Sequence, residues 1–418
     1  MRRSGLSTAC LAVVMAWSCR DGAPRRPART ANDGPIAGRA AVEDLVLGQS
    51  EGDSGATFSG IVAVHVDGRG NIYVLDNGDR AIQVFAPDGR HLRAIGGNGS
   101  GPGEFRDPAG FSVLGDSLLV TYDRILQRLT WFGMDGRLVT TRSVKLPMMQ
   151  YGLVTYVAAL DRGALVFGVT MGYHTEPRPG RDGTGTLLRV SADGSVIDTI
   201  LAFDGPRMIA VRAQWRYPLL FPTPFAPGPH WDIGPDARIA FGYGDRNDIA
   251  VLDGAGRQVQ RLQWDMPPSS VTGADVRDFR ASFPWGDGVK GLDPATRDAA
   301  KRVLDTLAMP VAWPAFDAIR FDDRGRLWVR RAAGDRIPIS EWDVFANGTQ
   351  RLGTVRLPRR LSVRQISRDA IYGVTTDEDG VPRVRRFRLV DPTRERSRVD
   401  SAGPRASGHQ PGRTTGRE

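Results

Sequence analysis

Acidic, basic and tyrosine side chains recur along this chain in short segments that follow apolar stretches. Arginine, aspartate and tyrosine groups that converge can bind a polar or anionic ligand through charge-assisted hydrogen bonds. Alternatively, each Asp and Arg pairs locally and fixes its own loop, which is favoured because the two charges occur together. The candidate ligand-binding residues are Asp79, Arg80, Tyr122, Asp123, Arg124, Tyr173, His174, His230, Trp231, Tyr243, Asp245, Arg246, Arg330 and Arg331.

Histidine is the usual general base and a common metal ligand, and this chain has five. His65 stands within an apolar segment and is expected to make a structural hydrogen bond. His91 falls on a predicted outer strand and His409 near the end of the chain, which disfavours catalysis by either. For His174 and His230 a metal or general-base role stays open.

No H-E-x-x-H, G-x-S-x-G or P-loop signature occurs in the sequence. The glycine run from Gly96 to Gly103 lacks the Lys-Ser/Thr ending of a phosphate loop and indicates a turn instead. Asp232 and Asp317 could be ligands of a calcium-like divalent cation, but no spacing makes them converge. We therefore predict no metal site and no cofactor, assign no catalytic residue, and keep a divalent cation for the enzyme alternative.

A unit of short strands and tight turns carries these segments and returns about every fifty residues. The clearest copy is DGRGNIYVLDNGDRAIQVFAPDGR, residues 67–90, where Asp-Gly turns close apolar strands. Later copies turn near Asp135-Gly136, Asp193-Gly194, Ala255-Gly256 and Asn347-Gly348. Four strands per copy at this period are typical of the blades of a β-propeller.

The sixth copy ends after its third strand, whereas residues 42–47, VEDLVL, form an apolar strand that precedes the first copy. That strand can complete the last blade and so cover an edge that would otherwise be exposed. We predict an all-β fold: a six-bladed propeller of four-stranded antiparallel blades over residues 41–390, closed by the N-terminal strand.

A small helical insertion is expected over about 267–310, within this propeller. Asp293-Pro294 is a typical helix start, and Ala299, Val303 and Leu307 follow at four-residue steps. An aromatic-rich connector, residues 203–229, enters on the same side. Long loops therefore gather on the face where blade connectors meet the loops between second and third strands. This loop-rich face is the predicted binding face.

The first copy resembles the NHL repeat, a family of propeller blades. The matching residues are Asp67, Gly70, Asn71, Ile72, Tyr73, Val74 and Asp76, then Ile82, Gln83, Val84 and Phe85, then Asp88 and Gly89. Residues 97–108 look like connectors of exported, lipoprotein-like bacterial six-bladed propellers. The resemblance covers the architecture of all six copies but the sequence of one. Asp79-Arg80 replaces the Asn-His of many NHL blades, so no binding residue is carried over there.

Residues 1–19 place two arginines before a short apolar stretch, which predicts a signal peptide rather than a membrane-spanning helix. Cys19 follows Ala16-Trp17-Ser18, so it is either the lipidated cysteine of a lipoprotein or the first residue after ordinary cleavage. The other cysteine, Cys10, also lies in this leader, and the mature domain therefore has no disulfide. We predict export, to the periplasm or outer envelope as a lipoprotein or as a secreted protein.

The formal net charge of +9 does not indicate nucleic-acid binding. Most of it lies in residues 1–40 and in residues 391–418, and the propeller body is close to neutral. Residues 20–40 read as a flexible tether and residues 391–418 as a disordered basic tail, because both lack apolar periodicity.

Two functions remain open. The favoured one is a non-catalytic binding or scaffold module, expected as a monomer, for a protein, peptide or glycan, which touches a membrane only through a lipid anchor. The alternative resembles the six-bladed lactonases and propeller lyases, and implies a metal-dependent lactonase-like hydrolase or lyase with its site at the propeller axis.

Overall fold

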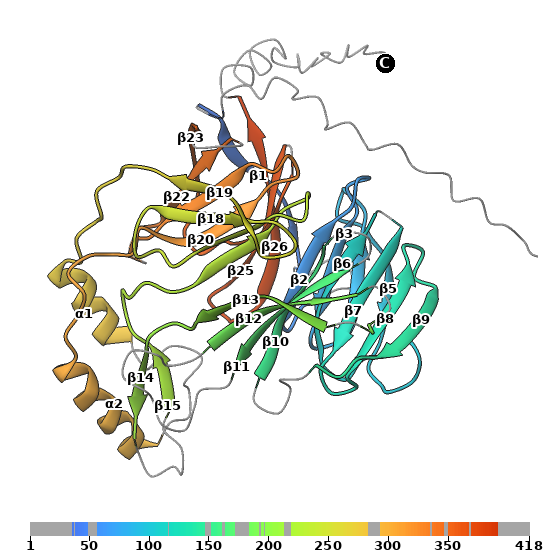
Figure 1. The fold of residues 1–418 in the computed structure, drawn as a ribbon, viewed down its shortest axis with the longest axis horizontal. Coiled ribbons are helices and arrows are strands. Elements are labelled where there is room, and N and C mark those ends of the chain that lie inside the picture. Colours follow the sequence, from blue (N-terminus) through green and yellow to red (C-terminus); the bar gives the residue numbers. More distant parts are fainter. Residues whose placement is uncertain are drawn as a thin grey trace, which may run out of the picture. The chain divides into compact units, whose positions relative to one another are not determined.

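Six four-stranded antiparallel sheets, the blades of a propeller, are present in the part of the chain that this computed structural model describes (Figure 1). The predicted six-bladed propeller is thereby confirmed. The described residues are 36, 38–48, 57–115, 117–146, 152–160, 164–171, 184–191, 194–195, 197–212, 219–282, 293–334, 337–346, 350–367 and 369–391. The predicted signal peptide, nearly all of the predicted tether and tail, and the candidates Tyr173 and His174 lie outside them.

The first three blades follow the chain from the innermost strand outward. Blade 1 contains β2 (Ile61–Val66), β3 (Ile72–Asp76), β4 (Ala81–Phe85) and β5 (His91–Gly96). Blade 2 contains β6 (Pro108–Leu114), β7 (Leu118–Asp123), β8 (Arg128–Gly133) and β9 (Leu138–Ser143). Blade 3 contains β10 (Gly152–Ala159), β11 (Leu165–Met171), β12 (Thr184–Val190) and β13 (Ile197–Asp204).

The last three blades keep this order, except that the outermost strand of blade 6 comes from the N-terminal end. Blade 4 contains β16 (His230–Ile233), β17 (Ile239–Gly242), β18 (Asp248–Leu252) and β19 (Gln258–Gln263). Blade 5 contains β20 (Phe316–Phe321), β21 (Leu327–Arg331), β22 (Ile339–Phe345) and β23 (Arg351–Pro358). Blade 6 contains β24 (Ser362–Ile366), β25 (Ala370–Thr376), β26 (Pro382–Val390) and β1 (Ala40–Leu47).

β1 closes the ring as predicted. It pairs antiparallel with β26 through seven residue pairs, from Ala40 opposite Val390 to Leu47 opposite Val384. Leu47 is only 3% exposed, which shows that the strand contributes to the core as well as covering an edge.

The hydrophobic core lies between neighbouring blades. The strands β3 and β4 are buried along their whole length, because the adjacent blades cover both faces of the sheet. Tyr73 and Leu75 of blade 1 pack in one cluster with Phe111 and Phe132 of blade 2. Each large side chain buried in this way contributes roughly 1.5 to 3 kcal/mol.

The penultimate residue of four inner strands interacts with the next blade. These residues are His65 in β2, Asp232 in β16, Arg320 in β20 and Gln365 in β24. The His65 ring packs edge-to-face against Phe111 of blade 2. Asp232 Oδ2 accepts from Phe321 N of blade 5 at 2.7 Å, and Arg320 Nε donates to Val363 O of blade 6 at 3.0 Å. Gln365 Oε1 accepts from Val66 N of blade 1 at 2.8 Å. This position fixes neighbouring blades to one another at the axis.

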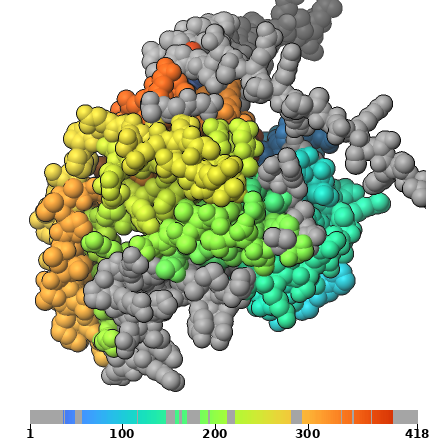
Figure 2. Space-filling model, viewed as in Figure 1, coloured from blue at the N-terminus to red at the C-terminus, as the bar shows by residue number. Residues whose placement is uncertain are grey.

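The described residues of the predicted insertion form two helices, α1 (Gly273–Ser282) and α2 (Pro294–Thr306). Asp293 caps α2, because its Oδ1 accepts a hydrogen bond from Thr296 N at 3.0 Å. The buried face of α2 contacts β14 (Met208–Val211), which pairs with β15 (Leu219–Pro222). Figure 1 shows this arrangement, and Figure 2 shows the orange atoms of the helical segment on the surface.

Within the described residues, neither helix has the length and apolar character needed to cross a membrane.

Candidate functional site

Two hollows lie on the loop-rich face, where inner strands begin and second strands end. The axial pocket has a volume of about 270 Å³ and is lined by Pro229, His230, Trp231, Asp317, Ala318, Ile319, Arg320, Arg330, Trp342, Ser362 and Val363. Its walls therefore come mainly from β16, β20 and β24, the innermost strands of blades 4, 5 and 6. The second hollow, the connector groove, has a volume of about 610 Å³.

His230 is a neutral side chain at the start of β16 in the axial pocket. Burial, reinforced by the charges of Arg330 and Arg320, lowers the pKa of His230 to about 4. At neutral pH its ring therefore offers one hydrogen-bond donor and one acceptor, without a charge.

The lowered pKa of His230 predicts a specific dependence of stability on pH. The folded-state pKa is below the ordinary value of 6.5, so the unfolded chain binds more protons between these two values and stability falls as the pH drops through them. Between about pH 7.5 and about pH 4.5, we expect the wild-type free energy of unfolding to fall by about 2 to 3 kcal/mol more than that of His230→Gln. Denaturant unfolding at each pH measures the difference, and parallel curves for the two proteins would contradict it.

Arg330 and Asp317 form an ion pair at the wall of the axial pocket. Arg330 Nε donates to Asp317 Oδ1 at 2.5 Å, and the guanidinium carbon lies 5.7 Å from the ring centroid of Trp342. Arg359, from the connector between blades 5 and 6, donates to the other carboxylate oxygen at 3.2 Å. Asp317 is thus hydrogen-bonded to two arginines.

Asp232 also has a hydrogen-bond partner within the protein for its carboxylate. Its carboxylate is buried, which raises its pKa, and it accepts the hydrogen bond from Phe321 N that joins blades 4 and 5. Within the described ranges no group of three or more His, Cys, Asp or Glu side chains could hold a metal ion. That part of the chain therefore offers no cluster of these four residue types to the metal-dependent alternative.

The connector groove lies between the connector of blades 4 and 5 and the loops of both blades. Its lining residues are Pro227, Gly244, Asp245, Arg246, Asn247, Met266, Pro267, Pro268, Ser269, Pro310, Val311, Ala312, Trp313, Pro314, Ala315, Arg331 and Ala332. Trp313 is held in place by Phe225, whose ring centroid is 4.7 Å away in an edge-to-face contact. Val311 is 86% exposed. The surface is mainly apolar, with the Asp245–Arg246 pair, 3.2 Å apart, among its polar residues.

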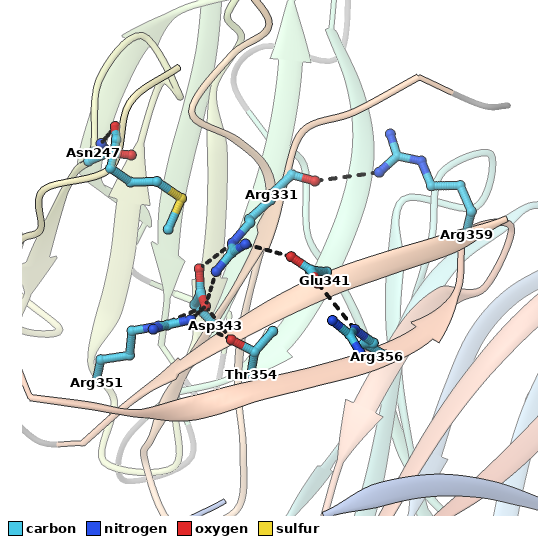
Figure 3. A network of polar contacts seen from close by, with 9 residues as sticks. Asn247, Arg331, Glu341, Asp343, Arg351, Thr354, Arg356 and Arg359 are labelled. Atoms are coloured by element: carbon cyan, nitrogen blue, oxygen red, sulfur yellow. Dashed lines mark hydrogen bonds and ion pairs between the residues drawn. The ribbon is translucent and has the colours of Figure 1, made fainter. Parts of the chain in front are cut away.

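Arg331 belongs to a polar network beside this groove. Figure 3 shows its guanidinium between Asp343 and Glu341: Nε donates to Asp343 Oδ2 at 2.8 Å and Nη1 to Glu341 Oε2 at 2.5 Å. Asp343 also accepts from Arg351 and Thr354. Burial opposes the charge on Asp343, but the hydrogen bonds from Arg331, Arg351 and Thr354 prevail and lower its pKa. Arg331 is thus fixed by its neighbours.

Two candidates at the end of β7, Asp123 and Arg124, also have partners within the protein. Asp123 is buried, and its carboxylate accepts hydrogen bonds from Arg106 N, Asp107 N and Leu126 N at 2.6 to 2.8 Å. Arg124 forms an ion pair with Asp107 at 2.5 Å. These contacts hold the connector from blade 1 against the end of β7.

Three further candidates lie apart from the two hollows. Tyr122 is buried, its hydroxyl donates to Val144 O at 3.1 Å, and burial, with the nearby Asp123 charge, raises its pKa to about 12. Asp79 accepts from Gln83, and Arg80 donates to Asn98 at 2.6 Å. These residues contact neighbouring protein groups, but these contacts are not the local Asp–Arg pairs that one of the two interpretations above expects.

The structure thus divides the sequence candidates into three groups. His230, Trp231 and Arg330 meet in the axial pocket, Asp245, Arg246 and Arg331 line the connector groove, and those of blades 1 and 2 stay in their own loops. Tyr243 is next to the groove, and its hydroxyl accepts from Asp204 N at 3.0 Å. The sequence missed Arg320, Val311 and Trp313, although a charged residue before the last position of an inner strand was a signal for Arg320.

Comparisons with known proteins agree with this architecture. The model of the DUF5128 family, described as a 6-bladed beta-propeller, matches residues 56–208. No curated protein matches the sequence. Together with the observed sheets, the match makes this chain a six-bladed β-propeller, as its resemblance to NHL repeats indicates.

Solved structures are similar over most of the chain at low sequence identity. A member of the DUF4221 family from Bacteroides vulgatus is 8% identical, with a TM-score of 0.50, and the match covers 85% of this chain and 99% of that one. A Bacteroides fragilis protein described as a "putative exported protein" is 12% identical, with a TM-score of 0.43 and coverages of 84% and 95%. Virginiamycin B lyase from Staphylococcus aureus is 12% identical, with a TM-score of 0.40 and coverages of 83% and 99%. At these identities the similarity concerns the fold alone.

Proposed function

We propose that this protein is an exported, non-catalytic propeller that binds an extended segment of a partner protein in the connector groove. The observation that carries the proposal is the groove itself, a mainly apolar hollow on the loop-rich face. Its volume of about 610 Å³ is within the usual range for ligand sites. Export is supported by the arginine-led apolar leader, and Cys19 is the proposed point of lipid attachment.

The chemistry of the lining favours a polypeptide over a glycan. Five of the lining residues are prolines, which have no backbone N–H to donate, and Met266, Val311 and Trp313 add apolar surface. One N–H of the Asn247 amide is already used, because Nδ2 donates to Met266 O at 2.7 Å. A glycan needs several hydrogen bonds to its hydroxyl groups, whereas apolar side chains of a peptide need only a dry surface.

The exposed Val311 supports the same conclusion. Exposed apolar side chains gathered at a hollow are typical of protein interaction sites, and aromatic residues are enriched at interface centres. Arg246 lies at this surface with its side chain 68% exposed. Because Asp245 already pairs with Arg246, we expect the bound segment to present mainly apolar side chains to the groove.

The test compares two valine substitutions. Peptides selected from a random library on the wild-type protein should bind Val311→Glu at least about tenfold more weakly, because the new carboxylate would be buried against apolar surface. Fluorescence polarisation measures the affinities.

Val259→Glu is the matched control, since Val259 is 56% exposed on β19 and does not line the groove. It should bind like the wild type. The proposal fails if no peptide can be selected, or if Val311→Glu binds the selected peptides as well as the control does.

A further inference from the structure

We propose that the axial pocket is a separate binding site, which takes the carboxylate or phosphate group of a small organic anion. This site shares no lining residue with the connector groove, so it does not depend on the proposed function.

Arginine side chains on the first and second strands of blade 5 and on the first strand of blade 6 give the pocket its charge. Arg320 of β20 and Arg330 of β21 line it directly. Arg364 of β24 follows the lining residues Ser362 and Val363, and its guanidinium is close enough to Arg320 for that charge to affect it. Guanidinium groups bind carboxylates and phosphates through paired charge-assisted hydrogen bonds.

The charges of Arg320 and Arg364 are not compensated by ion pairs among the described residues. Arg320 donates to two backbone carbonyls, Val363 O at 3.0 Å and Ile319 O at 2.7 Å. Arg364 takes part in none of the hydrogen bonds or ion pairs within the described ranges. Two like charges on adjacent strands repel each other, and an anion between them would remove that repulsion.

Arg364 is accessible to solvent and yet surrounded by protein. Its side chain is exposed, but burial among neighbouring atoms, together with the charge of Arg320, lowers the pKa of its guanidinium. A position on the innermost strand of a propeller accounts for both observations, because that strand borders the central channel. Arg364 does not line the pocket itself, so its charge acts there from beside Arg320, which does.

The acidic groups nearby do not cancel the positive charge. Asp317 is already paired with Arg330 and Arg359. Burial raises the pKa of Asp232 and prevails over the charge of Arg320, which acts to lower it, and this favours the neutral form of the carboxyl. Of the described residues, Arg320, Arg330 and Asp317 are the charged ones that line the pocket, Arg359 pairs with Asp317, and Arg364 adds a further positive charge near Arg320. The local excess of positive charge favours an anion over a cation.

The uncharged lining indicates an organic ligand. His230 is neutral at pH 7 and the hydroxyl of Ser362 is exposed, so both can bind hydroxyl groups. Trp231 and Trp342 supply apolar surface beside them. A volume of about 270 Å³ fits a small organic acid or phosphate ester.

The test uses the full chain and three probes at constant ionic strength: inorganic phosphate, succinate and glucuronate. We expect saturable binding of at least one probe by calorimetry, weakened about tenfold or more in Arg364→Gln, the loss typical of one charge-assisted hydrogen bond. Without ligand, Arg364→Gln should melt at the same or a higher temperature than the wild type, because the substitution removes a repulsion. A purely structural arginine would instead be needed for stability.

Arg142→Gln is the control, since Arg142 is an exposed arginine on β9 in blade 2. It should bind the probes like the wild type, as should Val311→Glu, which separates this site from the groove. Preference for phosphate or for a carboxylate identifies the ligand class. The proposal is overturned if no probe binds saturably at up to about 10 mM, if Arg364→Gln binds like Arg142→Gln, or if Arg364→Gln melts at a lower temperature than the wild type without ligand.

Discussion

A chain that begins at Gly48 is expected to lose the cooperative unfolding of the propeller. It lacks β1, so the backbone groups of β26 have no partner along seven residue positions, and the core contact of Leu47 is lost. The uncovered edge of β26 can then pair with other chains. We expect aggregation on size-exclusion chromatography and a broad, early thermal transition by circular dichroism.

The matched control begins at Ile36. It retains β1 and also Ile36, which is buried in the core cluster between blades 5 and 6. This chain should melt like the full protein. If the chain that begins at Gly48 melts cooperatively at the same temperature, then β1 does not hold the ring closed and the prediction is wrong.

Asp322→Ala is expected to destabilise the protein by about 3 to 5 kcal/mol. The Asp322 side chain is fully buried and forms an ion pair at 2.6 Å with Arg326, which is 4% exposed. It also accepts from Trp328 Nε1 at 2.9 Å and from Arg324 N and Arg326 N. Removing the carboxylate leaves a buried guanidinium and a buried indole N–H without this acceptor. Denaturant unfolding measures the loss.

Asp253→Ala tests whether burial of the carboxylate causes the loss of stability expected for Asp322→Ala. Asp253 makes similar contacts to its own turn and to the arginine four positions on, in the turn between β18 and β19 of blade 4: its oxygens accept from Ala255 N, Arg257 N and Arg257 Nε. Its arginine partner is largely exposed, and water can replace the lost contacts. Asp253→Ala should therefore lower the free energy of unfolding much less than Asp322→Ala does. If both substitutions lower it equally, the turn contacts, rather than the burial of the carboxylate, supply the stability.

The architecture could be predicted from the sequence because its signals are local. Asp-Gly turns such as Asp88-Gly89 recur, and Gly89 and Gly136 both adopt positive φ values that favour glycine. The closing strand was also predictable, since residues 42–47 formed an apolar strand that completes the count of strands. The β14–β15 hairpin was not predicted, because its two strands of four residues lie within an aromatic-rich connector.

The site was only partly predictable, because side-chain partners lie far apart in sequence. Asp123 reads as an exposed charge beside Arg124, yet its carboxylate is buried under the backbone of the preceding connector. Arg320 alternates with apolar residues in β20, as a surface residue would. Arg320 comes close to Arg364 only because blades 5 and 6 are neighbours in the folded ring. Sequence patterns show which residues share a strand, but not which strands meet at an axis.

The pairing of β1 with β26 also constrains the order in which the protein can form. Ala40 and Val390 stand opposite each other although 350 positions separate them, so this contact has a very high sequence separation. During synthesis β1 emerges first and its partner emerges last. Blades 1 to 5 each draw their four strands from one stretch of the chain, whereas blade 6 is incomplete until the C-terminal strands join β1. Ring closure is therefore the last step of folding, and until then β1 must stay unpaired or be kept from other partners.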